Sequence, residues 1–495
     1  MDRELHWYDY LTINAFWLGI NVSSGIITPV LLPYLVALFV PADQKNTYLA
    51  ILRVITLAVA MMVQPMAGLL SDRSTLRWGR RRPFIVIGTI FNLIFLAIIG
   101  ASPQFQNVEA DHFFQSTLGV STAYFVLLVG VICLQISANV AHGAMQGLIP
   151  DLVPEDKRGR ASGVKSVMEL LPVALVIFVG PLIDSGRIWL TVGIIGFAFA
   201  ATMLITVLFV DEEPREEKPD TPLLPSLARF VGLALIFVTV TQGAVWLVRL
   251  AGDWITARNG AIAPQVAVIG TTGLLGMAGA VFLGVYLGAW IGIGKGARQH
   301  TSFIWWVINR LLFLAALVSI QSFAQYYLAD VLEIPNAASV TTILLGVVAL
   351  FLIPSALGGG YLADRIGRKR LVMAAGLTAG VGAVVLLLAP SLPVVIVSGC
   401  IIGLGGGTFM ATNWALGTDL VPAEESGRYL GISNLAGAGA GIVGTGIGGP
   451  MADALNAIQP GLGYLTIFAI YAALFVLSAL VLSRVETGAL LAGAE

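Results

Sequence analysis

Long stretches of apolar residues, separated by short polar loops, recur along the whole chain. Most stretches contain roughly 20 or more residues, the length that an α-helix needs to cross a bilayer. The strands of a membrane barrel would instead alternate apolar and polar residues over about 10 positions, and the chain does not show that alternation. The pattern therefore predicts an all-α, polytopic membrane protein.

The apolar stretches predict two sets of six spans with two further spans between them. The first six are expected near residues 12–39, 48–71, 83–103, 119–149, 161–184 and 187–210. The two middle spans are expected near 225–251 and 263–293. The last six are expected near 302–331, 337–362, 371–390, 392–417, 429–455 and 461–483. This count of about 14 spans divides the chain into an N-terminal six-helix bundle (1–210), a charged linker with the middle pair (211–300) and a C-terminal six-helix bundle (301–495).

Composition supports the membrane assignment, because 57% of the 495 residues are hydrophobic, 11% are charged and the net charge is −1. A soluble chain of this size would need more charged surface, and the near-neutral charge gives no reason to expect a nucleic-acid partner. Cys133 and Cys400 fall in apolar stretches, so neither predicts a disulfide or a metal site. We find no nucleophile–base, metal-ligand or nucleotide-binding pattern, and we expect neither an enzyme nor a bound cofactor.

A short arginine-rich turn follows the second span of each set. The first copy runs from Gly68 to Ile85 (GLLSDRSTLRWGRRRPFI) and the second from Gly360 to Leu371 (GYLADRIGRKRL). Basic loops mark the cytoplasmic side of a membrane, and the alternation of basic and non-basic loops places both termini there if the two middle spans form a hairpin. The segments 150–165 and 418–433 repeat in the same order. The two repeats predict a duplicated transporter.

These turns resemble the signature of the major facilitator superfamily, and the resemblance covers the chain apart from the middle pair of spans. The longer form, SDRSTLRWGRRRPFI, resembles the glycoside–pentoside–hexuronide cation symporters and the related sucrose transporters. The resemblance implies the major facilitator fold, in which two six-helix bundles rock about a central cavity lined by the first and fourth helices of each half. The two extra spans would lie outside that core.

The fourth span departs from the sucrose-transporter pattern. Gln135 stands where those proteins carry a membrane carboxylate, Gln146 stands where they carry Arg, and Asn139 matches their Asn. The second span also lacks the acidic pair that binds the cation in melibiose-type relatives. Ion coupling would therefore need Glu169 or His142; otherwise transport would not be coupled to an ion.

Polar residues recur at helical spacing inside several spans, where facing lipid would be costly. We expect the following residues to line a solute cavity: Asn14, Asn21, Gln135, Asn139, His142, Gln146, Arg310, Gln321 and Gln325. Hydrogen bonding between helices is the alternative interpretation. Arg310 can bind an anionic group of a solute or pair with a carboxylate such as Glu169.

Two residues of the spans are candidates for proton coupling. Loss of water favours the neutral form of the Glu169 carboxyl, and His142 can titrate near neutral pH. The competing interpretation pairs Glu169 with Lys165, one turn earlier on the same helix.

Charged residues of the two repeats can form ion pairs that close the cytoplasmic side. We expect the arginines to bridge to carboxylates such as Asp151, Glu155, Asp419 or Glu424. The candidate gate residues are Asp72, Arg73, Arg80, Asp151, Arg160, Asp364, Arg365, Arg368, Asp419 and Arg428. The alternative is that the arginines only fix the topology. In the eleventh core span, the pairs Gly437/Gly441 and Gly444/Gly448 predict close packing against neighbouring helices.

We therefore expect a monomeric secondary transporter of the plasma membrane that moves a small polar solute by alternating access, with a sugar or glycoside as the leading candidate. Its partners would be the solute, the lipid bilayer and, for coupled transport, H+ or Na+. Export of amphipathic compounds is the first alternative. A membrane assembly factor that has kept the fold without transport is the second.

Overall fold

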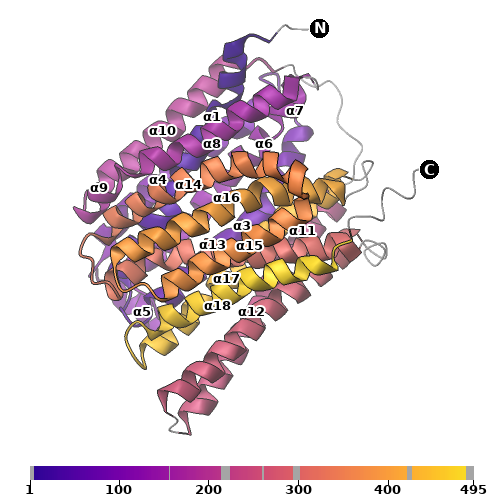
Figure 1. Ribbon diagram of the computed structural model, residues 1–495. Helices are drawn as coiled ribbons and strands as arrows, with labels where there is room; N and C mark the ends of the chain where they lie inside the picture. Colours follow the sequence, from indigo (N-terminus) through magenta and orange to yellow (C-terminus); the bar gives the residue numbers. More distant parts are fainter. Residues whose placement is uncertain are drawn as a thin grey trace. The chain divides into compact units, whose positions relative to one another are not determined.

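The computed structural model describes residues 5–154, 157–212, 223–258, 261–293, 301–420 and 426–486. Within these ranges the regular secondary structure is helical, without a strand (Figure 1), which confirms the all-α prediction. The chain divides into two compact units. Unit 1 contains Met1–Pro41, Val59–Phe230 and Ala338–Thr342, and unit 2 contains Ala42–Ala58, Val231–Ala337 and Ile343–Glu495.

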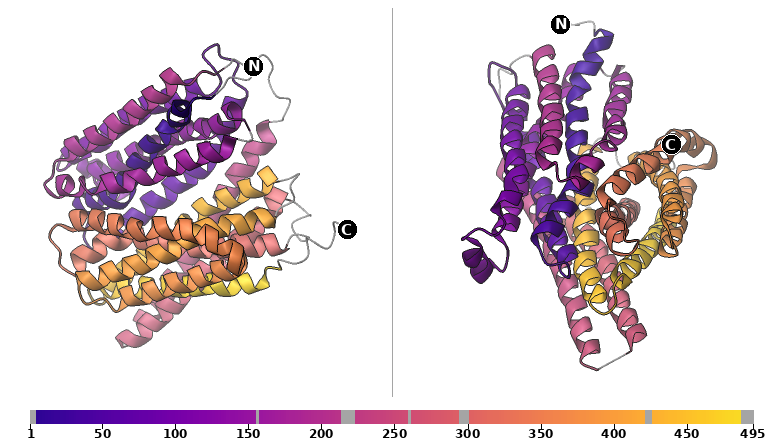
Figure 2. Two further views of the ribbon diagram at one scale, coloured as in Figure 1. Left: turned by 45° about the horizontal axis from the view of Figure 1, so that its top comes forward. Right: turned by 90° about the vertical axis from the view of Figure 1, so that its left-hand side faces the viewer.

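Unit 1 is built from long helices of the N-terminal half. They are α1 (Trp7–Ile26), continued by η1 (Ile27–Leu31) and α2 (Leu32–Phe39), then α4 (Arg82–Ala101), α6 (Thr122–Met145), α8 (Arg158–Val176) and α10 (Ile188–Phe209). The shorter elements are η2 (Ser102–Phe105), α5 (Asp111–Leu118), α7 (Leu148–Leu152) and α9 (Gly180–Asp184). Helix α1 packs against α8 and α10, and α4 packs against α6 and α10. Figure 2 shows the helices of this unit in indigo to magenta. Phe16 and Phe199 lie at the centre of the α1–α10 contact, with ring centroids 5.0 Å apart.

Unit 2 is built from the C-terminal half together with the middle pair of helices. Its helices are α11 (Leu223–Thr256) from Val231 onward, α12 (Ile262–Ile293), α13 (Thr301–Asp330), α15 (Arg368–Leu387), α16 (Leu392–Asp419), α17 (Ser426–Asn456), α18 (Leu462–Val481) and η6 (Leu482–Arg484). Helix α15 packs against α16 and α18, and α13 packs against α17 and α18. Helix α12 packs against α13, α17 and α18. Helix α11 also contacts α17, because Cβ atoms on Gly439 and Gly446 would lie 2.7 Å from Phe237 and 2.9 Å from Thr241. Both helices of the middle pair therefore pack against the C-terminal half.

The second helix of each half is shared between the units. These helices are α3 (Lys45–Asp72) and α14 (Ala337–Ile366). The beginning of α3 belongs to unit 2, and residues 338–342 at the beginning of α14 belong to unit 1. Each unit thus contains the start of a helix whose remainder belongs to the other.

Twelve helices within the described ranges are long and apolar enough to cross a membrane. Helices α8 and α17 are not among them. Helix α8 carries Arg158, Arg160, Lys165 and Glu169 within its 19 residues, which lowers its apolar character. The expected number of about 14 spans therefore stays a prediction.

The fifth span is broken where the sequence pattern predicts one helix over 161–184. Helix α8 ends at Val176, and the short helix α9 begins at Gly180. Pro181 has no N–H to donate, and its ring would clash with the carbonyl group of Ile177, four residues earlier. The proline therefore separates the span into two helices.

The glycines of α17 pack against other helices of unit 2, as predicted. A Cβ atom on Gly441 would lie 2.7 Å from Leu57, and one on Gly444 would lie 2.5 Å from the Ala315 carbonyl oxygen. A Cβ atom on Gly448 would lie 2.1 Å from the Tyr471 hydroxyl oxygen. Side chains cannot occupy these positions without separating the helices.

The middle pair of helices is longer than a bilayer requires. Helices α11 and α12 contain 34 and 32 residues, which corresponds to about 50 Å each against a hydrocarbon core of about 30 Å. The ends of α11 and α12 that lie next to each other in sequence extend beyond the neighbouring helices of unit 2 (Figure 1).

Candidate functional site

A cluster of aromatic and charged side chains lies in unit 1 where α1, α6 and α8 meet. The rings of Trp17 and His142 stand edge to face, with centroids 5.2 Å apart. The Lys165 ammonium lies 4.1 Å from the centre of the Trp17 ring, and its Nζ lies 3.2 Å from Oε1 of Glu169. Three helices thus bring an indole, an imidazole and an ion pair together.

The polar stripe of α6 supplies one wall of this cluster. His142 Nε2 lies 3.3 Å from Gln146 Nε2, and Gln146 is exposed while His142 and Gln135 are half-buried. Asn139 is buried and donates a hydrogen bond of 2.8 Å to the Gln135 carbonyl oxygen. Their spacing places these side chains on one side of the helix, as expected.

The two asparagines of α1 occupy different environments. Asn14 is fully buried, and its Nδ2 donates to the carbonyl oxygens of Tyr10 (2.8 Å) and Ala161 (3.2 Å). The second bond ties α1 to α8. Asn21 is half-buried and donates to the Trp17 carbonyl oxygen at 2.8 Å. Asn21 is therefore the better placed of the two to meet a solute, because Asn14 is enclosed by the core.

Glu169 makes the ion pair with Lys165 that the competing interpretation required. Both side chains are about one-third exposed, at 34% and 31%. The pair is therefore accessible and is not buried in the core. Proton transfer by Glu169 stays a prediction.

A second polar cluster lies in unit 2 between α13 and α16. Nη1 of Arg310 donates to Oδ1 of Asn413 at 3.2 Å, and the guanidinium lies 5.2 Å from the centre of the Trp414 ring. Asn413 in turn donates to Oδ1 of Asn309 at 2.8 Å and accepts at its carbonyl oxygen from Nε1 of Trp306 at 2.9 Å. Nε of Arg310 is buried without a hydrogen-bond partner. In unit 2, Arg310 thus contacts the side-chain amide of Asn413 and the indole ring of Trp414.

The two glutamines further along α13 differ in exposure. Gln321 is exposed and Gln325 is buried, with an exposed fraction of 5%. Their contribution to a solute site stays a prediction.

Two tryptophans of these clusters and one arginine of α3 were not among the residues predicted from the sequence. Trp17 and Trp414 lie next to the predicted polar positions, but an aromatic residue in an apolar span is not distinguishable by pattern from a core residue. Arg53 is a lone arginine inside the apolar stretch of α3, which was a usable signal. It is buried, with an exposed fraction of 8%, and its Nε has no hydrogen-bond partner.

The first arginine turn is organised around Arg81. Its guanidinium is 6% exposed and bonds to Oδ2 of Asp151 (3.0 Å), Oδ1 of Asp72 (2.5 Å) and Oγ of Ser71 (2.6 Å). A Cβ atom on Gly147 would lie 2.3 Å from this guanidinium. Arg81 thus fills a space that the absence of a side chain at position 147 leaves open.

The two turns share an equivalent ion pair. Arg80 pairs with Asp151 in unit 1, and Arg368 pairs with Asp419 at 2.5 Å in unit 2. Each arginine follows a glycine with positive φ, Gly79 at 99° and Gly367 at 95°. The repeats therefore fold into the same local arrangement, with a conformation that favours glycine.

The turns differ one residue later. Lys369 stands at the position that corresponds to Arg81, and it donates to the carbonyl oxygens of Val485 (2.6 Å) and Ser483 (3.4 Å). Asp364 lies 3.8 Å from Arg368, whereas Asp72 bonds to Arg81. The N-terminal turn is thus a carboxylate network, and the C-terminal turn contacts the end of the last helix.

Glu212 holds the beginning of α4 against the first turn. Its carboxylate accepts hydrogen bonds from the backbone N–H groups of Arg81 (2.9 Å) and Arg82 (3.0 Å). Burial raises the pKa of Glu212 above its ordinary value, although these hydrogen bonds and the neighbouring arginines act in the opposite direction. A Cβ atom on Gly79 would lie 2.5 Å from the Glu212 carboxylate, so glycine permits this contact.

The remaining gate candidates have separate positions. Arg73 is half-buried and Arg160 is exposed, and the Arg365 guanidinium lies 4.5 Å from the centre of the Tyr361 ring. Glu155, Glu424 and the side chain of Arg428 lie outside what the structure describes. In the described part of the chain, the ion pairs of the turns join residues of the same half. A gate between the halves at this end stays a prediction.

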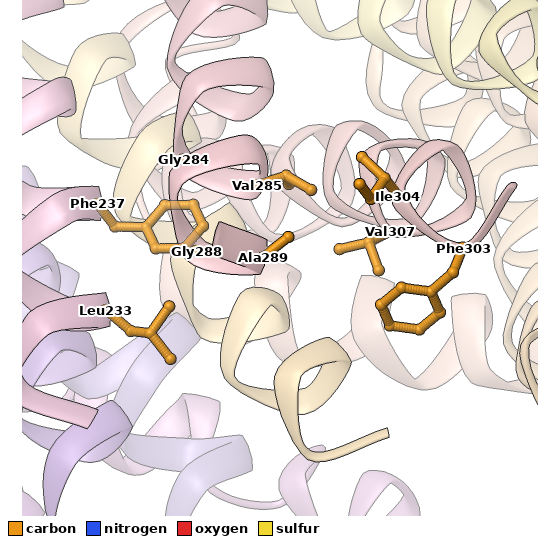
Figure 3. A pocket seen from close by; sticks show the side chains of 9 residues that line it. All are labelled: Leu233, Phe237, Gly284, Val285, Gly288, Ala289, Phe303, Ile304 and Val307. Atoms are coloured by element: carbon orange, nitrogen blue, oxygen red, sulfur yellow. The ribbon is translucent and has the colours of Figure 1, made fainter. Parts of the chain in front are cut away.

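Two pockets of the described residues have apolar walls. The first is small and lies between α11, α12 and α13, where Phe237, Val285 and Phe303 are among the lining residues (Figure 3). The second lies between α4 and α6, with Phe91, Phe95 and Ser137 among its lining residues. Neither pocket offers a set of polar groups that would recognise a polar solute.

Twelve membrane-length helices among the described residues are the features of a multi-pass membrane protein, and comparison with known proteins specifies the family. The family model described as Major Facilitator Superfamily matches residues 11–445 and 311–492. The chain belongs to the major facilitator superfamily, and it is an integral, multi-pass membrane protein.

Two similar proteins are sugar transporters by name. The sucrose transport protein SUC3 of Arabidopsis thaliana is 34% identical over 107 residues, which are 21% of this chain and 18% of that protein. The general alpha-glucoside permease of Schizosaccharomyces pombe is 24% identical over 210 residues, which are 41% of this chain and 37% of the permease. The match therefore spans less than half of either relative's length.

A solved structure of a D-xylose-proton symporter has the same fold. It superposes with a TM-score of 0.64 and 15% sequence identity, covering 97% of this chain and 98% of the symporter. At this identity the likeness shows the major facilitator fold alone.

Proposed function

We propose that this protein transports a sugar or glycoside across the membrane by alternating access. Family membership supports transport, and the partial similarity to sucrose and alpha-glucoside carriers supports a sugar as the solute. The family and its fold are those of transporters, which supports a function other than enzymatic catalysis.

The observation that carries the proposal is the cluster around Trp17. A sugar presents apolar ring faces and a rim of hydroxyl groups, so its site needs a flat apolar surface beside hydrogen-bonding groups. The Trp17 indole is 7% exposed and carries the Lys165 ammonium over its ring in this structure, so it would supply the surface when Lys165 moves away. His142, Lys165 and Glu169 supply polar groups beside it. Asn21 and Gln146 extend the same polar stripe on α1 and α6.

Proton coupling, if the carrier uses it, would act through the Lys165–Glu169 pair. Protonation of Glu169 would break its attraction to Lys165 and leave the ammonium free to contact a solute hydroxyl. The D-xylose-proton symporter supports this choice of ion by its name alone. In proteoliposomes, Glu169→Gln is expected to abolish uptake driven by a proton gradient while retaining exchange of labelled for unlabelled solute.

The proposal is tested by ligand-induced thermal stabilisation of the purified protein. Sucrose, maltose and D-xylose would each be added to the detergent-solubilised chain and the melting temperature measured, because a ligand that binds only the folded state raises it. We expect at least one of these sugars to stabilise the parent chain and to lose that effect in Trp17→Ala. The matched control is Trp246→Ala, because Trp246 is 61% exposed on α11.

Two results would contradict the proposal. One is the absence of stabilisation by any sugar of a panel that includes mono- and disaccharides. The other is equal stabilisation of the parent chain and Trp17→Ala, which would place the sugar away from this cluster. Stabilisation by amphipathic compounds alone would favour export of such compounds.

A further inference from the structure

A third repeat, Gly-Pro-x-x-Asp, closes the fifth helix of each half. It reads GPLID over Gly180–Asp184, at α9, and GPMAD over Gly449–Asp453, in α17. Both aspartates use their carboxylates at the beginning of a helix that belongs to the opposite half of the sequence. The two copies therefore share a structural role as well as a sequence.

In unit 1, Asp184 caps α14. Its carboxylate accepts hydrogen bonds from the backbone N–H groups of Ala338 (3.2 Å) and Ser339 (2.7 Å) and from the Ser339 hydroxyl. The first N–H groups of a helix have no partner within the helix, and a negative charge there is favourable. Asp184, on α9, thus accepts the hydrogen bonds of backbone N–H groups at the start of α14.

In unit 2, Asp453 caps α3 in the same way. Its carboxylate accepts from the backbone N–H groups of Asn46 (3.3 Å) and Thr47 (2.6 Å) and from the Asn46 side-chain amide (2.8 Å). Asp453 is 8% exposed. Both aspartates therefore bond to the N–H groups of the second and third residues of the helix that they cap.

The glycine of each repeat allows the capped helix to approach. A Cβ atom on Gly180 would lie 2.6 Å from Cα of Ser339, and one on Gly449 would lie 2.4 Å from the carbonyl oxygen of Asn46. Real Cβ atoms do not approach backbone atoms so closely. Glycine and aspartate thus act together, one by admitting the helix and the other by binding its end.

These contacts join residues of opposite halves, whereas the ion pairs of the arginine turns within the described ranges join residues of one half. Each capped helix runs from its carboxylate to an arginine turn, so the caps and the turns lie at opposite ends of α3 and of α14. Ties between halves are the ones that must break when two bundles rock.

We propose that Asp184 and Asp453 are paired latches, which close one end of the transporter and release when that end opens. The proposal rests on the alternating-access function proposed above. It assigns the gating contacts to the ends of α3 and α14 that are distant from the arginine turns. The latch at α3 is the more extensive of the two, because Lys45 also pairs with Asp330 at 2.6 Å and Tyr464 donates to the same carboxylate at 2.6 Å.

The test is the accessibility of cysteines placed behind each latch. Thr342 and Ala50 are 0% and 1% exposed and lie beside Gly180 and Gly449. Thr342→Cys and Ala50→Cys would be made separately in a chain lacking Cys133 and Cys400. The rate of labelling by a water-soluble maleimide would then be measured in proteoliposomes without solute.

Asp184→Ala is expected to raise labelling at Thr342→Cys, and Asp453→Ala at Ala50→Cys, by about tenfold, the change in a two-state equilibrium that corresponds to about 1.4 kcal/mol. Asp184→Asn and Asp453→Asn keep an acceptor oxygen and should raise the rates less. If an alanine variant does not fold, its asparagine counterpart carries the same comparison.

The matched control is Asp111→Ala. Asp111 also caps a helix, accepting from the Thr122 N–H at 2.8 Å, but both residues belong to the N-terminal half. Its loss should leave labelling unchanged. The proposal is overturned if the latch variants label at the parent rate, or if Asp111→Ala raises labelling equally. Since no solute is present, failure of sugar transport would not alter either outcome.

Discussion

At the scale of the residue, the arginine turn shows what a sequence pattern specifies. Five arginines between positions 73 and 82 predict a basic loop, and alignment of the repeats singles out Arg80 and Arg368 with their partner aspartates. The pattern does not tell which guanidinium is buried. Burial of Arg81 depends on Gly147, in the turn between α6 and α7, leaving room for it, and such a contact has no signal in the local sequence.

Removing Arg81 should therefore destabilise the protein more than removing any exposed arginine of the turn. Arg81→Ala leaves Asp151 with Arg80 alone and removes the Arg81 bond of Asp72, which is 40% exposed; loss of a hydrogen bond to a charged group costs about 1.5 kcal/mol or more. Denaturant unfolding in detergent would measure the change. Arg77→Ala is the control, because Arg77 is exposed, and an equal loss in both variants would refute the central role of Arg81.

Glu212 should make stability depend on pH in a defined direction. Burial raises its pKa above the ordinary value of 4.5, so its contribution favours the folded state below about pH 4.5 and is lost as the pH rises through the higher folded pKa. Glu212→Gln does not titrate. The melting temperature of the parent should therefore fall relative to that of Glu212→Gln as the pH is raised from about 4. A constant difference, or a difference of opposite sign, would contradict this assignment.

At the scale of the helix, the length of the apolar stretches predicts the elements well but not how their ends are held. The beginnings of α3, α4 and α14 are capped by Asp453, Glu212 and Asp184, which lie more than 100 residues away in the sequence. The break in the fifth span had a readable signal in Pro181. The carboxylate that caps each helix had no such signal, because contacts between residues so far apart in the sequence form only in the folded chain.

The close approach of α17 to α3 gives a test of packing at this scale. Gly449→Ala would place a methyl group 2.4 Å from a backbone oxygen and 2.5 Å from Cβ of Ala50, so the helices must separate. Overpacking of this kind costs about 1–3 kcal/mol. The control, Gly279→Ala on α12, meets nothing within 4 Å and should be neutral or slightly stabilising. Thermal unfolding of both variants checks the difference, and equal melting temperatures would contradict the packing.

At the scale of the whole molecule, duplication and composition were sufficient to predict the family. The repeated turns carried the resemblance, and the family match confirms it. The number of spans was harder to predict, because α8 contains charged residues and is less apolar than a typical membrane-spanning helix. The sequence predicted a polar site in each half, and it offered Lys165, one turn away on the same helix, as the partner of Glu169. The partner of Arg310, Asn413, lies on another helix, and apolar periodicity does not encode such packing.

The predicted orientation can be measured on the intact protein. If the arginine turn lies in the cytoplasm, a cysteine at Arg77 should resist an impermeant maleimide added to right-side-out membranes, whereas one at Glu109 should react. Both positions are exposed, so a difference would reflect sidedness. Reaction of Arg77→Cys but not of the cysteine at position 109 would indicate the opposite topology.

The measurement that tests the account most directly is uptake of a labelled sugar into proteoliposomes that contain the purified chain. A sugar that stabilises the protein is expected to show saturable uptake, which is lost in Trp17→Ala and retained in Trp246→Ala. Comparing uptake with and without an inward proton gradient would show whether a proton accompanies the sugar. Uptake no greater than that of protein-free liposomes, for every sugar that binds, would contradict the account.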